Sequence, residues 1–153
     1  DYQYSSEILS LLTNSVITTT GGATCLLLAA LYGSTKIVSE IFKLSSSSLY
    51  SQHINLRYQT NDGRNVLFYT VYNGHSNLLT YLLQNGLSDM INQVNNSGES
   101  PLYYACLNGH VDCVRILIEN GCYISTDKIT SEIICQNMTI YKNSESESIY
   151  NVQ

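Results

Sequence analysis

The stretch SPLYYACLNGHVDCVRILIENG, residues 100–121, joins two apolar segments through a Gly-His pair and ends at Asn-Gly. Ser100 is a residue type that caps helix N-termini, and Pro101 suits the first helical position because its missing N–H has no helical partner there. Gly109 and Gly121 suit the left-handed conformation that ends many helices. The stretch therefore predicts a short helix, a glycine turn and a longer helix.

The pattern occurs three times when Gly33, Gly74 and Gly109 are aligned as anchors. Before each anchor, a glycine lies eleven residues away, an N-cap type nine and a leucine seven. After each anchor, positions four, five, eight and nine residues on are apolar, which is the spacing of one helix face. These positions are Ile37, Val38, Ile41, Phe42, Leu78, Leu79, Leu82, Leu83, Cys113, Val114, Leu117 and Ile118. Because such short helices are marginal alone, the repetition predicts helix pairs stabilised by stacking.

The three units resemble the ankyrin repeat, whose pattern has a Thr-Pro-Leu-His start, a Gly-His turn and an apolar second helix. Ser100-Pro101-Leu102 stands at the Thr-Pro-Leu position, and Gly109-His110 and Gly74-His75 match the turn, whereas Gly33-Ser34 departs from it. The helix-start histidine is replaced by Leu27, Phe68 and Tyr103. The resemblance implies an all-α, ankyrin-type helical repeat solenoid with short β-hairpin-like connecting loops. It also implies that the turn histidines His75 and His110 are structural and hold adjacent loops by hydrogen bonds.

We expect residues 1–153 to form a single ankyrin-repeat domain. It divides into an N-terminal partial repeat or cap (1–21), a repeat with an inserted loop (22–56), two further repeats (57–93 and 94–125) and a degenerate C-terminal cap with a tail (126–153). Residues 6–12 have the pattern of a second helix, residues 130–138 that of a capping helix, and residues 144–148 that of a solvated tail or a phosphorylation target. Ser45–Ser48 indicates that the insertion is a loop. Because the chain begins without methionine, we expect it to be a piece of a longer protein.

Composition argues against several classes of partner. The net charge is -5 and no Lys/Arg cluster occurs, so we expect no nucleic-acid binding. The longest apolar run is seven residues, Cys25–Leu31, far below the ~20 that a membrane helix needs, so we expect no membrane insertion. Five cysteines without C-x-x-C spacing favour an intracellular, cytoplasmic location. We expect a monomer.

Cys106, His110 and Cys113 of the opening stretch could form a reactive site, but their positions in the repeat favour a structural role. Cys113 shares a core position with Ile37 and Leu78, and Cys106 is in a column that calls for a small apolar residue. A catalytic Cys/His pair needs an accessible, low-pKa thiol and an orienting group, and neither is indicated. We therefore expect no enzyme activity, no cofactor and no metal. Cys122, after the helix-ending glycine, is expected to be the more accessible thiol.

A binding surface is the remaining functional prediction. In a solenoid, the first helices line a concave face, and helical spacing directs the residues five, two and one positions before each anchor toward it. Tyrosine suits such a surface because its rigid ring buries a large area while its hydroxyl still finds a partner. The predicted partner-binding residues on this face and the loop tips are Leu31, Tyr32, Asn61, Asp62, Arg64, Tyr69, Tyr72, Asn73, Asn96, Glu99, Tyr104, Leu107 and Asn108.

Exposure is favoured for Tyr32 and Tyr72, whereas inter-helix packing is an equal alternative for Tyr69 and Tyr104. We expect a non-catalytic module that binds a partner protein of unknown identity. One alternative is a domain that recruits substrate for a larger enzyme or acts as a ubiquitin-ligase adaptor. Others are a purely structural spacer and, because the composition suggests an AT-rich coding source, a host-directed interaction protein of a pathogen or virus.

Overall fold

The computed structural model describes residues 24–48, 51 and 54–123. The predicted partial helix at 6–12, the capping helix at 130–138 and the tail at 144–148 lie outside the described residues. Three helix pairs make up the described part, and each pair begins with a helix of seven residues. The pairs are α2 (Cys25–Leu31) with α3 (Thr35–Ser45), α4 (Val66–Tyr72) with α5 (Ser76–Leu82), and α6 (Pro101–Leu107) with α7 (Val111–Glu119).

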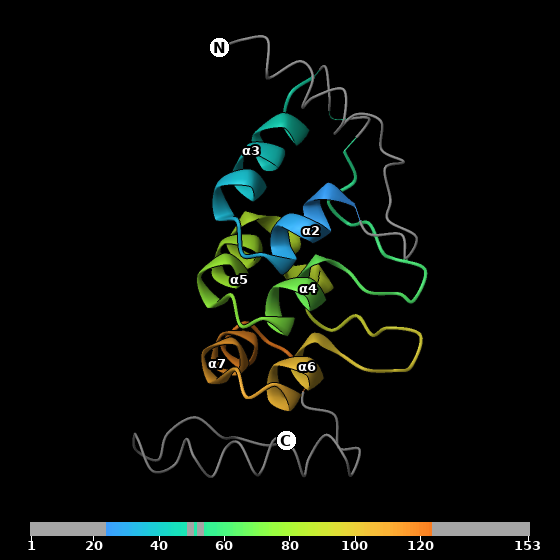
Figure 1. Cartoon of the computed structure of the whole chain (residues 1–153), viewed down its shortest axis with the longest axis vertical. Coiled ribbons are helices and arrows are strands. Elements are labelled where there is room, and N and C mark those ends of the chain that lie inside the picture. The colour runs from blue at the N-terminus through green and yellow to red at the C-terminus, as the bar shows by residue number, and fades with distance from the viewer. Residues whose placement is uncertain (1–23, 49–50, 52–53, 124–153) are drawn as a thin grey trace.

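The helix pairs stack along the long axis of the molecule (Figure 1). The first helices α2, α4 and α6 form one column, in which α2 packs against α4 and α4 against α6. The second helices α3, α5 and α7 form the other column. A π-type turn, η1 (Leu83–Leu87), and a 3₁₀ turn, η2 (Ser88–Met90), follow α5. The predicted all-α repeat solenoid is confirmed.

Side-chain caps begin each first helix where the sequence predicted. The Thr24 hydroxyl accepts a hydrogen bond from the Leu27 N–H at 3.4 Å, and the Ser100 hydroxyl accepts one from the Tyr103 N–H at 3.2 Å. The Asn65 side-chain oxygen accepts a hydrogen bond from the Leu67 N–H, in the first turn of α4, at 2.9 Å. These caps satisfy N–H groups that have no partner inside the helix.

The glycine turns between the paired helices close the same way in each repeat. At the first turn, the Ser34 N–H donates to the Ala29 carbonyl at 2.9 Å and the Gly33 N–H donates to the Ala30 carbonyl at 3.1 Å, the Schellman pattern that requires a left-handed residue. Gly33 has φ 67°, and a Cβ there would lie 2.5 Å from the His75 Nδ1 atom of the next repeat. Glycine is therefore needed both for its backbone conformation and for room.

The core lies between the two helix columns and draws on both. Of the twelve apolar positions predicted on the second helices, only Ile37 is exposed. Leu78 and Cys113, at the same position in the next two pairs, are buried. Ile37 belongs to the first described pair, and the chain before Thr24 lies outside the described residues.

The ends of two helices differ from the sequence prediction in detail. Ser46–Ser48 are non-helical as predicted, but α3 extends through Ser45, whose hydroxyl donates to the Phe42 carbonyl at 2.7 Å. Cys122 is buried rather than accessible, since the chain after Gly121 turns back and places the Cys122 Sγ atom 4.0 Å from the Ile91 carbonyl. Cys25, at the start of α2, is the exposed thiol among the described cysteines.

Candidate partner-binding surface

Three large apolar side chains are exposed on the column of first helices, in or just after the last turn of each helix. Tyr32 is 78% exposed, Tyr72 48% and Leu107 53%. Tyr72 and Leu107 each lie two residues before a turn glycine, and Tyr32 lies one residue before Gly33. Equivalent positions on stacked helices face the same way, so Tyr72 and Leu107 share one side of the molecule, and Tyr32 lies one position further along, at the end of the neighbouring helix α2. We call Tyr32, Tyr72 and Leu107 the exposed stripe.

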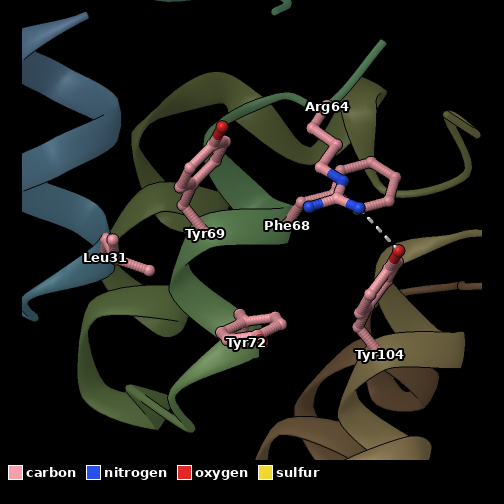
Figure 2. A pocket seen from close by; sticks show the side chains of 6 residues that line it. All are labelled: Leu31, Arg64, Phe68, Tyr69, Tyr72 and Tyr104. Carbon is pink, nitrogen blue, oxygen red and sulfur yellow. Dashed lines mark hydrogen bonds between the residues drawn. The ribbon is translucent and has the colours of Figure 1, made fainter. Parts of the chain in front are cut away.

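A small pocket of about 90 Å³ adjoins the stripe. Figure 2 shows that its walls come from three successive first helices and the loop before α4. Leu31 and Tyr69 are half-buried in it, so the structure brings both next to Tyr72, as the predicted surface requires. The lining residues are Leu31, Arg64, Phe68, Tyr69, Tyr72 and Tyr104.

Tyr104 packs against its neighbours instead of projecting into solvent, which settles the alternative that the sequence left open. It is 9% exposed, and its ring makes an edge contact with Phe68 at 5.9 Å between centroids. The Tyr72 ring lies 6.1 Å away. Tyr104 therefore forms the floor of the pocket, and little of its surface is available to a partner.

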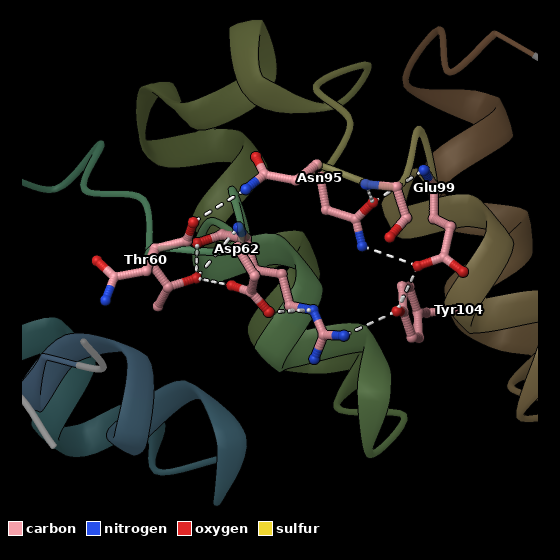
Figure 3. Close-up of polar contacts among 9 residues, drawn as sticks. Thr60, Asp62, Asn95, Glu99 and Tyr104 are labelled. Atoms are coloured by element: carbon pink, nitrogen blue, oxygen red, sulfur yellow. Dashed lines mark hydrogen bonds and ion pairs between the residues drawn. The ribbon is translucent and has the colours of Figure 1, made fainter. Parts of the chain in front are cut away.

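Arg64 links the loop before α4 to the Tyr104 hydroxyl (Figure 2), and Figure 3 shows Asp62, Asn95, Glu99 and Tyr104 in the same group of polar contacts. Its Nη2 donates to the Tyr104 oxygen at 2.9 Å, and its guanidinium carbon lies 5.1 Å from the centroid of the same ring. Arg64 Nε lies 3.1 Å from Asp62 Oδ2, but the N–H is not aimed at an acceptor, so this contact is an ion pair without a hydrogen bond. Asp62 also accepts a hydrogen bond from the Thr60 hydroxyl.

Glu99 completes this network from the next loop. The Tyr104 hydroxyl donates to Glu99 Oε2 at 2.7 Å, and the Asn95 amide donates to the same oxygen at 2.8 Å. Both hydrogen bonds favour the carboxylate and lower the pKa of Glu99, the bond from Tyr104 most. Burial, and then the adjacent carboxylate, raise the pKa of Tyr104. The sequence predicted Arg64 and Glu99 as partner-binding residues, and the structure engages both within the domain.

The predicted amides Asn73 and Asn108 bind the preceding repeat. Asn73 Nδ2 donates to the Leu31 carbonyl at 2.7 Å, and the His75 Nε2 atom is 2.9 Å from the same oxygen. In the next repeat, Asn108 Nδ2 and His110 Nε2 lie 2.9 and 3.0 Å from the Tyr72 carbonyl. We call each Asn/His pair on one carbonyl a turn clamp. Each histidine ring donates only if its proton is on Nε2.

The loop tips also stack on each other. The Asn96 side chain donates to the Asn61 carbonyl at 2.9 Å, and the Asn96 N–H donates to the Asp62 carbonyl at 2.9 Å. Within each loop, a backbone hydrogen bond closes a hairpin-like turn. The Thr60 N–H donates to the Arg64 carbonyl in one loop, and the Asn95 N–H donates to the Glu99 carbonyl in the other. Asn95 is buried, and the run Asn95–Gly98 has the turn residues that the sequence predicts before the cap of α6.

The buried thiols are poorly suited to chemistry. Burial raises the pKa of Cys106 and Cys113 to about 11 and that of Cys122 to about 12, so each is protonated at neutral pH. Among residues 24–48, 51 and 54–123, no group of three or more His, Cys, Asp or Glu side chains could hold a metal ion. No helix in this part of the chain is long and apolar enough to cross a membrane.

Comparison with known proteins agrees with this architecture. The ankyrin repeat domain of human ASB11 superposes with a TM-score of 0.57 at 24% sequence identity, over 75% of this chain and 54% of that one, which shows a common fold. The chain thus spans about half the length of that domain. No curated protein matches the sequence significantly. A family model described as ankyrin repeats (3 copies) matches residues 47–128, more than half of the chain. Ankyrin repeats are in general protein-interaction modules, and this chain belongs to the ankyrin repeat family.

Proposed function

We propose that the domain is a non-catalytic module that binds a partner protein through the exposed stripe and the pocket beside it. The observation that supports this most is the exposure of Tyr32, Tyr72 and Leu107 at the ends of three stacked first helices. Large apolar side chains gathered on one face commonly belong to interaction sites, and tyrosine is enriched among residues that dominate binding.

The loop-tip residues have a supporting role in this proposal. Asp62, Arg64 and Glu99 already have partners within the domain, so they shape the edge of the surface rather than supply free hydrogen-bonding groups. The amides of Asn73 and Asn108 are likewise engaged in the turn clamps. We therefore propose that affinity comes mainly from the exposed stripe.

The finer assignments of the domain remain part of the same proposal. We propose one ankyrin domain across the chain, a monomeric state and an intracellular location. The buried cysteines support the last point, because Cys106, Cys113 and Cys122 occupy core positions as small apolar side chains.

The test begins with a partner captured by the full 153-residue chain and identified by mass spectrometry. Calorimetry then compares its affinity for Tyr32→Ala, Tyr72→Ala and the matched control Tyr123→Ala, which is 79% exposed and lies after α7 rather than on a first helix. Each stripe variant should weaken binding by about 2 kcal/mol while unfolding changes by less than about 0.5 kcal/mol. Lys36→Ala, on the second-helix column, should bind as the native chain does. Equal losses from all four variants, or losses confined to the controls, would contradict the proposal.

A further inference from the structure

The pocket beside the exposed stripe is an inter-repeat feature. Leu31 comes from α2, Phe68, Tyr69 and Tyr72 come from α4, and Tyr104 comes from α6 (Figure 2). No single repeat could form it, so its shape depends on the stacking that the turn clamps fix. Such a pocket is suited to an anchoring side chain of a partner segment that crosses the repeats.

The volume of the pocket limits the size of its occupant. At about 90 Å³ it is well below the roughly 300 Å³ at which small-molecule sites begin. An enclosed apolar cavity that accepts benzene measures about 150 Å³, so this smaller pocket, which is open to the surface, encloses less than a whole aromatic ring. An aliphatic side chain of three or four carbons is the class of group that the volume favours.

The charges at the rim limit the occupant further. The Arg64 guanidinium lies 5.1 Å from the Tyr104 ring centroid and already takes the place that a lysine or a methylated ammonium group would occupy over that ring. A second cation there would be repelled by Arg64. An incoming carboxylate would meet Asp62, which pairs with Arg64, and Glu99, whose pKa is lowered so that it is ionised at neutral pH. The rim therefore disfavours both signs of charge.

The surface that leads to the pocket is also uncharged. The helices α2, α4 and α6 have the sequences CLLLAAL, VLFYTVY and PLYYACL, which contain no charged residue. Charge in the network beside the pocket is confined to the loop residues Asp62, Arg64 and Glu99. An uncharged occupant therefore suits the helices, and the charged loop residues disfavour a charged occupant.

We infer that the pocket takes one uncharged aliphatic side chain, leucine, isoleucine, valine or methionine, from a partner segment that lies along the exposed stripe. This inference rests on the proposed function and names the chemistry that the same surface selects. The aliphatic side chain is the anchor, because it replaces water in a pocket lined by four aromatic rings. Tyr32, Tyr72 and Leu107 contact the flanking residues of the segment.

The experiment selects binders of the full chain from a displayed library of random twelve-residue peptides. Peptides that lose binding to the Tyr32→Ala/Tyr72→Ala double variant are retained as stripe ligands. In each, the anchor is located by alanine scanning and then replaced in turn by phenylalanine, lysine and glutamate. We expect an aliphatic anchor, with affinity reduced about tenfold or more by each replacement.

A variant that fills the pocket provides the second measurement. Leu31→Phe adds a ring at the pocket wall and should reduce the affinity of the same peptides about tenfold, whereas Val94→Phe, at an exposed apolar site in the loop before α6, should not. Thermal unfolding checks that Leu31→Phe is folded, and the peptide replacements decide the matter if it is not. Stripe ligands with an aromatic or charged anchor would overturn this inference alone. A library without stripe-dependent ligands would overturn the proposed function as well.

Discussion

The two interfaces between consecutive repeats share one set of contacts and differ in another. At both, a turn clamp joins an asparagine and a histidine to a carbonyl of the preceding repeat, Leu31 in one case and Tyr72 in the other. The second interface also has the polar network of Asp62, Arg64, Tyr104 and Glu99 and the stacked loop tips, whereas the loop before α2 lies outside the described residues. At the first interface Tyr69 holds the position of Tyr104, but Ala23 and Arg64 stand in the sequence where the second interface has Arg64 and Glu99, so the same pair of hydrogen bonds cannot form there.

This difference indicates which parts of the repeat are general and which are particular to this chain. The turn clamp uses backbone carbonyls, so it can recur wherever the turn histidine and asparagine are present. The Tyr104 network uses side chains on three different elements and exists at one interface among the described repeats. Substitutions in the core, at the turn glycines and at Tyr104 separate the two contributions, in decreasing order of expected effect.

The largest effect is expected from the shared core. Leu82 and Leu117 are fully buried at the same position of α5 and α7. Replacing either by alanine removes buried carbons and leaves a cavity, so each should destabilise the domain by about 2–5 kcal/mol. Urea denaturation of the full chain measures this. Changes below about 0.5 kcal/mol would mean that these positions are not core and that the repeat register is incorrect.

The turn glycines isolate the steric part of the turn clamps. A Cβ at Gly33 or Gly74 would lie 2.5 Å from the ring of His75 or His110, whereas one at Gly109 would meet nothing within 4 Å. All three have positive φ, so alanine costs about 1–2 kcal/mol of backbone strain at each. Gly33→Ala and Gly74→Ala should therefore exceed Gly109→Ala by about 1 kcal/mol or more in thermal unfolding. Equal costs at all three would show that the histidine rings move aside freely.

Removing one hydroxyl tests the network that is particular to the second interface. Tyr104→Phe deletes the bridge between Arg64 and Glu99 and should cost about 1–2 kcal/mol, because hydrogen bonds to charged groups are the stronger class. Tyr69→Phe, on the same face, is the matched control and should change stability by less than about 0.5 kcal/mol. Denaturation at neutral pH compares them. Similar values for the two variants would show that the bridge adds nothing.

The stability difference between the native chain and Tyr104→Phe should also depend on pH, and the pKa of Glu99 gives the direction of that dependence. The pKa of Glu99 is lower in the folded state than its usual value near 4.5, so its contribution is complete above that value and is lost as pH falls through the folded pKa. The stability gap between the native chain and Tyr104→Phe should therefore narrow below about pH 4. A gap that is constant or grows toward acid would exclude the carboxylate as the important partner.

Helix positions could be predicted from the sequence because they depend on local chemistry. Thr24, Asn65 and Ser100 cap the helices they precede, and the glycine anchors end the first helices, since both effects act within one turn of chain. The exposure of a given side chain was harder to predict. Tyr69 and Tyr104 have the same sequence position in their repeats, yet Tyr104 alone has Arg64 and Glu99 beside it.

The two residues whose exposure was predicted wrongly, Cys122 and Ile37, differ from the prediction for the same reason. Cys122 follows a helix-ending glycine, which suggested exposure, but it is covered by the Ile91 region of the preceding repeat. Ile37 fits the apolar pattern of the second helices, yet no earlier helix pair lies against it within the described residues. In both cases local pattern gives the helix face correctly, while the neighbouring repeat decides what that face contacts. The assignment of Tyr32, Tyr72 and Leu107 to a partner is likewise a matter for binding experiments.

The smallest effect is expected from the thiols, which report how often the second interface opens. Cys25 is exposed, whereas Cys106, Cys113 and Cys122 are buried, with pKa values raised to about 11 to 12 by burial. Partial burial also raises the pKa of Cys25, but its exposed position makes it accessible. At neutral pH, iodoacetamide should therefore label Cys25 faster than the buried three, which react only through local opening. Mass spectrometry of peptides from timed samples follows each site.

Tyr104→Phe connects this measurement to the two interfaces. If the network keeps α6 and α7 against α4 and α5, its loss should accelerate labelling of Cys106, Cys113 and Cys122 by a factor similar to the change in the opening equilibrium, about fivefold to thirtyfold for 1–2 kcal/mol. Cys25 lies outside this interface and should react at the native rate, which makes it an internal control in every sample. Acceleration of all four sites would instead indicate global unfolding. Unchanged rates at the buried three would mean that the turn clamp and the core hold the second interface closed without the network, as they do at the first.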